Sequence, residues 1–410
     1  MPVRLDKVPA LAPRPARPSV LWWLGLLLFF VFLGMSTAVL LSVQPLEEQP
    51  MNFWALHLGV PVLSWCVLGF GRLLVHIAQH SVVDGWNEAR QEDINQKIRR
   101  GRRSQQVLST SLYTGLRELG QPPANQLDAL LSGASAMKIH SARLAESAAL
   151  HSSLPGDTLE DPEFVLRQVL GQLLAELAPS LAQLPHDQPL ALLLELDSGL
   201  PEDRLRQLWQ QAWVESGIRQ PITSVEGTGL AALDHWLDQR IADKALLLVV
   251  ALHFASLQPE GTAEVAVGVL FGNRMTQATL SPLAYLHRPE EEREKTPEHL
   301  RYAMRQALDW VPLQGHSILQ VWGVGDISQR GAALASALTE VQMPAQHTPA
   351  FCNLDDVLGA SGLAAPWLAV AAATQNIQHR AEAQFVFSGG RAVEVGLWCT
   401  VLTPVTPLSK

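Results

Sequence analysis

Cysteine is scarce in this sequence, and charged residues are absent from two long stretches of it. Only three of the 410 residues are cysteines. Cys66, Cys352 and Cys399 lie far apart and show no paired spacing. This excludes a disulfide framework and fits a reducing compartment. The net charge of −9 gives no reason to expect general nucleic-acid binding.

Common motifs of catalytic and cofactor sites are also missing. The sequence has no GxSxG elbow, no P-loop and no GxGxxG turn. His76 and His80 stand four residues apart, a spacing that can hold a metal ion, but no Cys or carboxylate accompanies them at ligand spacing. We interpret them as a chance pair, and we expect neither a metal nor a cofactor.

The two charge-free stretches run from Val20 to Val43 and from Met51 to Gly71. A helix needs about 20 apolar residues to cross a bilayer, so each stretch predicts a transmembrane helix. The alternative for the first is a signal peptide, whose apolar core would be only about 7–15 residues long. The alternative for the second is a buried core helix. We interpret His57 as an interfacial residue rather than a ligand.

Positive charges predict the orientation of the two spans. The loop between them holds Glu47 and Glu48 and no Lys or Arg. Basic residues precede the first span and follow the second: Arg4, Lys7, Arg14 and Arg17 before it, and Arg72, Arg90, Lys97, Arg99, Arg100, Arg102 and Arg103 after it. Basic flanks stay inside, so both termini are expected in the cytoplasm and the protein in a bacterial inner membrane.

The predicted organisation has six parts. They are a basic N-terminus (1–19), a first span (20–43), an external loop (44–50), a second span (51–72), a stalk helix with a basic linker (73–103) and a cytoplasmic domain (104–410). We expect the cluster KIRRGRR at 97–103 to rest on anionic lipid headgroups. A dedicated protein or nucleic-acid contact is the alternative.

The cytoplasmic part alternates strands and helices. Apolar runs at 190–196, 245–254, 265–272 and 317–326 predict strands buried on both faces, with amphipathic helices between them. The stretch from His140 to Asp161 has weak periodicity and predicts a long loop. The segment LAAPWLAVAAAT has no charged side chain and predicts a helix buried between two sheets. The fold class is therefore α/β, with a mostly parallel sheet covered on both faces.

Several segments, in the same order, resemble the β-ketoacyl synthase branch of the thiolase-like family. QVLSTSLYTGLRELG resembles the family's first strand, VEGTGLAALDHWLDQRI its nucleophile turn and helix, and QVWGVGD the strand of its HGTGT motif. LDDVLGASGLAAPWLAVAAA resembles the KxxxGHxxGAaG helix, and FVFSGGRAVEVGLWCTVL the closing hairpin. The resemblance implies a thiolase-like layered α-β-α-β-α domain after an N-terminal transmembrane helical hairpin.

Matched to these motifs, the three catalytic positions of the family hold other residues. Glu226 stands at the position of the nucleophilic Cys, Trp322 at the first His and Asp356 at the second. A condensing enzyme needs a thiolate to carry the acyl group and imidazole donors to stabilise the oxyanion. The resemblance therefore implies a pseudoenzyme with no catalytic residue. If the alignment slips, Cys352 becomes the candidate thiol, although a free Cys is usually a small buried hydrophobe.

The overall layout resembles the adaptor proteins of type VI secretion gene clusters that accompany lipase effectors. That resemblance implies a cytoplasmic binding protein that delivers a secreted effector to the secretion spike, with the membrane and a protein as partners. The fold leaves a homodimer open. The alternatives are an acyl-binding or acyl-transfer protein of lipid metabolism, or a structural subunit. An enzyme predicts that Glu226, Trp322 and Asp356 converge on an open pocket, whereas an adaptor predicts a plugged pocket and an apolar patch elsewhere.

Overall fold

The computed structural model describes residues 3–42, 45, 49–144, 148–156, 160–325, 327–346, 348–389 and 396–405. Its contacts divide the chain into two compact units. One unit is Arg4–Lys97, and the other contains the chain from Ile98 onward.

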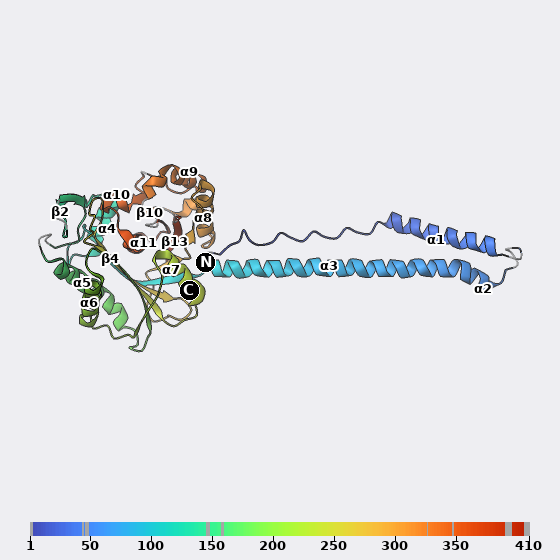
Figure 1. Ribbon diagram of the computed structural model, residues 1–410, viewed down its shortest axis with the longest axis horizontal. Coiled ribbons are helices and arrows are strands. Elements are labelled where there is room, and N and C mark those ends of the chain that lie inside the picture. Colours follow the sequence, from blue (N-terminus) through green and yellow to red (C-terminus); the bar gives the residue numbers. More distant parts are fainter. Residues whose placement is uncertain are drawn as a thin grey trace. The chain divides into compact units, whose positions relative to one another are not determined.

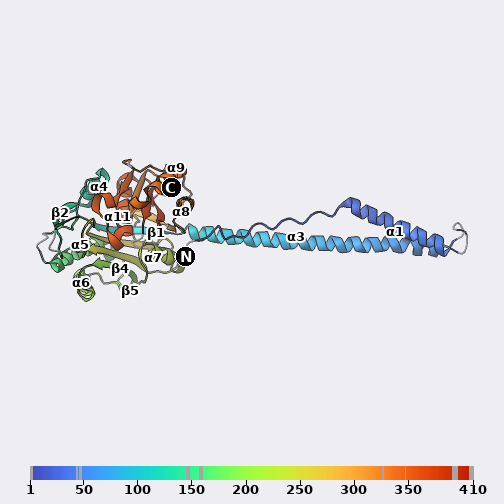
Figure 2. The same cartoon turned by 45° about the horizontal axis from the view of Figure 1, so that its top comes forward.

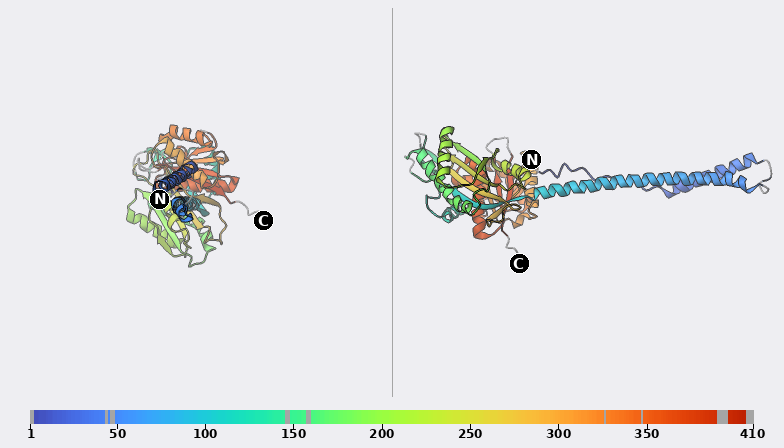
Figure 3. Two further views of the ribbon diagram at one scale, coloured as in Figure 1. Left: turned by 90° about the vertical axis from the view of Figure 1, so that its right-hand side faces the viewer. Right: turned by 90° about the horizontal axis from the view of Figure 1, so that it is seen from below.

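The first unit is built of helices. They are α1 (Val20–Leu41), α2 (Met51–Trp54), the π-helical turn η2 (Ala55–Gly59) and α3 (Val60–Gly101). The long helix α3 continues without a break past the end of the unit (Figure 3). Two helical stretches are long and apolar enough to cross a membrane, with mean hydropathies of 2.5 for Val20–Leu41 and 1.8 for Met51–Gly101. Most of the predicted external loop lies outside the described residues.

Small residues bring α1 against the start of the second helical stretch. Gly34 and Ala38 are the buried residues of α1. A Cβ atom at Gly34 would collide with the carbonyl oxygen of His57, so the two backbones touch there. The Trp65 indole Nε1 donates a hydrogen bond of 2.9 Å to the carbonyl of Trp23. Close approach at small residues is typical of helix packing in membranes.

The second unit contains a mixed sheet, with eleven strands among the described residues. The first half holds β1 (Ser104–Tyr113), β4 (Leu190–Ser198), β5 (Ile222–Ser224), β6 (Leu246–Phe254) and β7 (Val265–Asn273). The second half holds β8 (Ala284–His287), β9 (Glu290–Glu291), β10 (Gln320–Val324), β11 (Phe351–Asn353), β12 (Gln384–Ser388) and β13 (Trp398–Pro404). Antiparallel pairing of β1 with β8 joins the halves.

The two halves repeat one strand order. In space the first half runs β5-β4-β6-β7-β1, and the second runs β11-β10-β12-β13-β8. In the first half β4 is parallel to β5 and β6, and in the second half β10 is parallel to β11 and β12. The last strand of each half is antiparallel to both of its neighbours: β7 to β6 and β1, and β13 to β12 and β8. The domain is therefore an internal duplication of one α/β unit, with β9 as an addition.

Helices cover both outer faces of the sheet. The helices of the unit are α4 (Pro123–Ser132), α5 (Pro162–Ala182), α6 (Glu202–Glu215), α7 (Gly229–Gln239), α8 (Pro297–Asp309), α9 (Gly331–Val341), α10 (Leu354–Leu358) and α11 (Ala365–Arg380). Helices α5 and α6 lie on one side of the domain and α8 and α9 on the other, with α11 between (Figures 1 and 2). Successive strand residues join different cores: Val249 packs in the inner cluster, whereas Leu248 and Val250 pack against α5.

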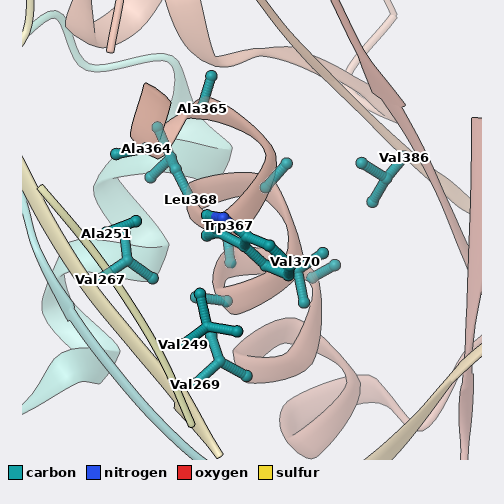
Figure 4. Packing of buried hydrophobic residues seen from close by; sticks show 14 of the residues in the cluster. Val249, Ala251, Val267, Val269, Ala364, Ala365, Trp367, Leu368, Val370 and Val386 are labelled. Atoms are coloured by element: carbon teal, nitrogen blue, oxygen red, sulfur yellow. The ribbon is translucent and has the colours of Figure 1, made fainter. Parts of the chain in front are cut away.

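The inner layer is the Ala-rich helix α11. Every residue from Ala365 to Ile377 is buried, and the helix contacts strands of both halves. Figure 4 shows Trp367, Leu368 and Val370 between the β6–β7 side chains and Val386 of β12. Small side chains let two sheets approach one helix, as the uncharged sequence predicts. The predicted α/β class and layered α-β-α-β-α arrangement are confirmed. The prediction of a mostly parallel sheet is wrong, because β1, β7, β8 and β13 pair antiparallel where the two halves meet.

One local prediction is wrong. The stretch from His140 to Asp161, predicted as a loop, contains most of a two-stranded antiparallel sheet of β2 (Lys138–Ser141) and β3 (Ala148–His151). These strands are short and largely exposed, so they lack the apolar alternation that marks a strand in a sequence. The closing strands β12 and β13 pair antiparallel as predicted, but most of their turn lies outside the described residues.

The last turn of α3, from Ile98, belongs to the second unit and makes its contacts within it. Arg103 Nη1 donates to the carbonyl of Leu237 at 2.7 Å. Arg288, which is fully buried, donates to the carbonyl of Arg100 and to the carboxylate of Asp238. Part of the basic cluster therefore contacts the protein's own domain, and its predicted contact with lipid headgroups, or with a partner, stays a prediction.

Alanine substitution of two glycines, Gly268 on β7 and Gly171 on α5, tests the packing of α5 on β7. A Cβ at Gly268 would lie 2.7 Å from Leu177 Cδ1 and 2.8 Å from Leu173 Cδ2, both fully buried. Gly268→Ala should therefore lower the free energy of unfolding by about 1–3 kcal/mol. The control Gly171→Ala on α5, where a Cβ meets nothing within 4 Å, should raise it by about 0.5–1 kcal/mol. Denaturant unfolding of the full chain in detergent measures both, and equal changes would contradict this packing.

Candidate functional site

The three positions matched to family catalytic residues lie in different surroundings. Glu226 is exposed in the loop between β5 and α7. Trp322 is fully buried on β10, where its indole Nε1 donates a 2.6 Å hydrogen bond to Gln384 Oε1. Trp322 belongs to the inner core cluster. The side chain therefore packs in the core, and its one polar atom has its hydrogen-bond partner inside the domain.

Asp356 lies on α10 and faces a cavity. The cavity has a volume of about 570 Å³ and is also lined by Leu131, Thr348, Phe351 and Cys352. Neither Glu226 nor Trp322 lines it. The structure therefore does not bring the three predicted positions together around this cavity.

A buried carboxylate occupies the N-terminus of α7. Glu195 on β4 is 4% exposed. Its Oε1 accepts a 2.5 Å hydrogen bond from the backbone N–H of Gly229, and its Oε2 accepts one of 2.8 Å from the Trp367 indole. The carboxylate thus joins β4, α7 and α11. The start of α7, where backbone N–H groups favour an anion, is filled by the protein's own carboxyl group.

Burial raises the pKa of Glu195, and the two hydrogen bonds from Gly229 and Trp367 oppose that rise. The residue was overlooked in the sequence, where it stands as the single charge in the apolar run LALLLEL. A charge inside a strand buried on both faces needs partners, so this pattern was the available signal.

A second polar pair consists of Asp197, two residues after Glu195 on β4, and His253 on β6. His253 Nε2 is 3.7 Å from Asp197 Oδ2, and His253 Nδ1 donates a 2.7 Å hydrogen bond to the carbonyl of Ala263. Gly362, in the 3₁₀ turn η5 (Gly362–Ala364), packs on the pair. A Cβ at Gly362 would lie 2.6 Å from both Asp197 Oδ2 and His253 Cδ2. Both ring nitrogens face protein groups, and the imidazole is buried.

Cys352 is poorly suited to act as a nucleophile. It is 7% exposed, and its Sγ donates to the carbonyl of Leu130 at 3.4 Å. Burial, with a smaller contribution from Asp356, raises the pKa of the thiol to about 12. A thiol with that pKa is almost entirely protonated at neutral pH, whereas the nucleophile is the thiolate. Among the described residues no group of three or more His, Cys, Asp or Glu is placed to hold a metal ion.

No family model matches the sequence, and no curated protein sequence does. Solved structures do match. The ishigamide ketosynthase/chain length factor aligns with a TM-score of 0.54 and 14% identity, over 74% of this chain and 100% of that one. The fold is thiolase-like. A ketosynthase domain for oxazolomycin from Streptomyces albus JA3453 aligns with a TM-score of 0.52 and 12% identity, over 75% of this chain and 76% of that one. At these identities the likeness extends to the fold alone.

The buried Glu195 predicts a pH-dependent stability. Its pKa in the folded chain lies above the ordinary 4.5, so the folded state binds the proton more tightly than the unfolded state. Its contribution to stability is therefore full below the unfolded pKa and declines as the pH rises through the folded pKa. The glutamine side chain of Glu195→Gln does not titrate, so this variant lacks the pH-dependent contribution to stability. From about pH 4 to about pH 8 the free energy of unfolding should shift in favour of the variant.

Denaturant unfolding of wild type and Glu195→Gln across this range measures the difference. Changes at other titrating groups cancel in the comparison. A difference that stays constant with pH, or one that moves in favour of the wild type, would contradict the buried carboxylate.

Proposed function

We propose that this chain is a non-catalytic, membrane-anchored binding protein. The observation that supports it best is the bridge from Glu195 to Gly229 and Trp367. It fills the start of α7 with an internal carboxylate, next to the exposed Glu226 that replaces a nucleophile in our alignment. A condensing reaction needs an accessible thiolate and donors for an oxyanion at one point in space. The described residues offer no such point around Glu226, Trp322 and Asp356.

The membrane anchor is the helical hairpin of α1 and the first part of α3. Both stretches are apolar enough to span, and the contacts of Gly34 and Trp65 hold them together. Positive charges flank the hairpin on the side of the N-terminus and of residues 73–103. By the positive-inside rule both termini lie in the cytoplasm, and the protein resides in a bacterial inner membrane.

Protease accessibility tests this topology. The chain should resist extraction by alkaline carbonate, and residues 104–410 should survive protease added to spheroplasts but be digested in inverted vesicles. The physical reason is that both basic flanks stay on the cytoplasmic side. Release by carbonate would refute the anchor, and digestion in intact spheroplasts would refute the orientation.

We infer further that the partner is a protein, and that the chain is an adaptor that takes a type VI secretion lipase effector to the spike. The resemblance in layout supports this client. Two pairs of exposed apolar side chains on the domain support a protein contact. On the β2–β3 sheet Ile139 is 76% exposed and pairs with the 37% exposed Leu150. Leu257 is 71% exposed, and its side chain and that of the loop residue Leu144 both lie beside Gly199. We call these four residues the hairpin patch.

Co-purification with the full chain tests the hairpin patch. Wild type and the double variant Ile139→Asp with Leu257→Asp are purified from membranes in mild detergent, and bound proteins are identified by mass spectrometry. One secreted effector should bind the wild type and fall at least tenfold in the variant, because two carboxylates oppose an apolar contact. Met275→Asp is the control, since Met275 is as exposed as Ile139, at 76%, and should retain the effector.

The second candidate is an acyl-binding protein of lipid metabolism. The observation that favours it is the cavity of about 570 Å³ at Asp356, part of whose wall is apolar. Recovery of acyl carrier protein or bound fatty acid from both wild type and variant, with no effector, would sink the adaptor hypothesis and favour this one. Recovery of nothing specific would contradict both.

A further inference from the structure

One face of α3 is covered within its own unit. The half-buried positions between Trp65 and Arg90 follow spacings of three and four residues: Trp65, Gly69, Arg72, His76, His80, Val83, Asn87 and Arg90. The extended segment ahead of α1 runs beside this face (Figure 1). Asn87 Oδ1 accepts from the backbone N–H of Ala12 at 3.1 Å, and Arg90 Nε donates to the carbonyl of Pro9 at 2.6 Å. This face already has its partners.

A second face of α3 has an apolar repeat and no cover. Seven positions alternate spacings of three and four residues, and we call them the α3 seam: Leu68, Gly71, Val75, Ala78, Val82, Gly85 and Ala89. All seven are exposed, including Val75 at 51% and Val82 at 73%. At 100° per residue the seam lies about 120° around the helix from the covered face. A sustained three-four repeat of apolar residues is the pattern of a coiled coil.

Most of the seam lies beyond the apolar span. The predicted span ends near residue 72, so Val75 to Ala89 stand in water rather than lipid. An apolar stripe in water is unfavourable unless another surface covers it. Nothing within 4 Å would meet a Cβ at Gly71 or Gly85, so the glycines of the seam face open space. A groove of about 640 Å³ between Pro15 and the seam residues Val75, Ala78 and Val82 adds a concave edge.

The charges of this segment suit a second identical helix. In the heptad set by the seam, the positions beside it from Val67 to Trp86 carry one charge, Arg72. Asp84 lies away from the seam, and acidic residues resume at Glu88, where the seam ends. Two identical stalks can therefore meet along it without opposed like charges over most of its length.

We propose that a second copy of this chain packs along the α3 seam to form a parallel two-stranded coiled coil. The proposal rests on the membrane anchoring proposed above, because insertion sets every copy in the same direction and at the same depth. Equivalent residues then meet across a two-fold axis along the membrane normal, which makes the contact self-complementary. The dimer would present two binding domains on one stalk.

Cysteine cross-linking in native membranes tests the seam. The background is Cys66→Ser, since Cys66 is the exposed thiol and the other two are buried. Oxidation should give a disulfide-linked dimer for Val75→Cys and for Val82→Cys, at a yield about tenfold or more above that for Asp84→Cys. The control Asp84 is exposed and lies about 150° around the helix from the seam. Equal yields at the three sites, or no dimer at any, would overturn the proposal.

A second measurement separates the seam from the anchor. Val75→Glu with Val82→Glu should convert the detergent-solubilised full chain from dimer to monomer in light scattering, whereas Ile77→Glu, on another exposed face, should leave it dimeric. Carbonate extraction of the same variants reports the anchor independently. Monomer in the wild type with intact membrane insertion would overturn the seam alone, and dimer in the double variant would also overturn it.

Discussion

The burial of one helix between two halves of a sheet is the constraint on which the domain depends. Helix α11 contacts strands of both halves, and every residue from Ala365 to Ile377 is buried. Its five alanines let the two layers approach, and the buried Trp367 is its largest side chain in the inner cluster. Because the strands are buried on both faces, nearly every residue of β6 and β7 must be apolar, as it is.

The same constraint decides what a polar group can do inside the domain. Two buried charges of the domain have internal partners: Glu195 bonds to Gly229 and Trp367, and Arg288 to Asp238. Such groups cost free energy when a partner is removed, since the remaining charge stays buried. A carboxylate at the start of α7 therefore serves to join three elements. Our main proposals therefore place the partners on the surface of the domain and along the stalk.

Much of the fold was predictable because its signals are local. Continuous apolar runs marked β4, β6 and β7, and Asp161 with Pro162 marked the start of α5, where Asp161 accepts from the N–H of Glu163. The internal duplication was not seen, because it resides in the pairing of distant strands and the halves share no obvious sequence repeat. The β2–β3 sheet was missed because exposed strands carry little pattern. The bridge at Glu195 depends on residues 34 and 172 positions away, and no local spacing reveals such contacts.

We propose that this thiolase-like fold carries no condensing chemistry. The most direct test incubates the purified full chain in detergent with acyl- and malonyl-loaded carrier protein, and measures the intact mass of the chain and the released products. A catalytic ketosynthase under the same conditions is the positive control. We expect no acyl adduct on the chain and no condensed product. A stoichiometric acyl adduct, on Cys352 or any other side chain, or turnover to a condensed product, would contradict it.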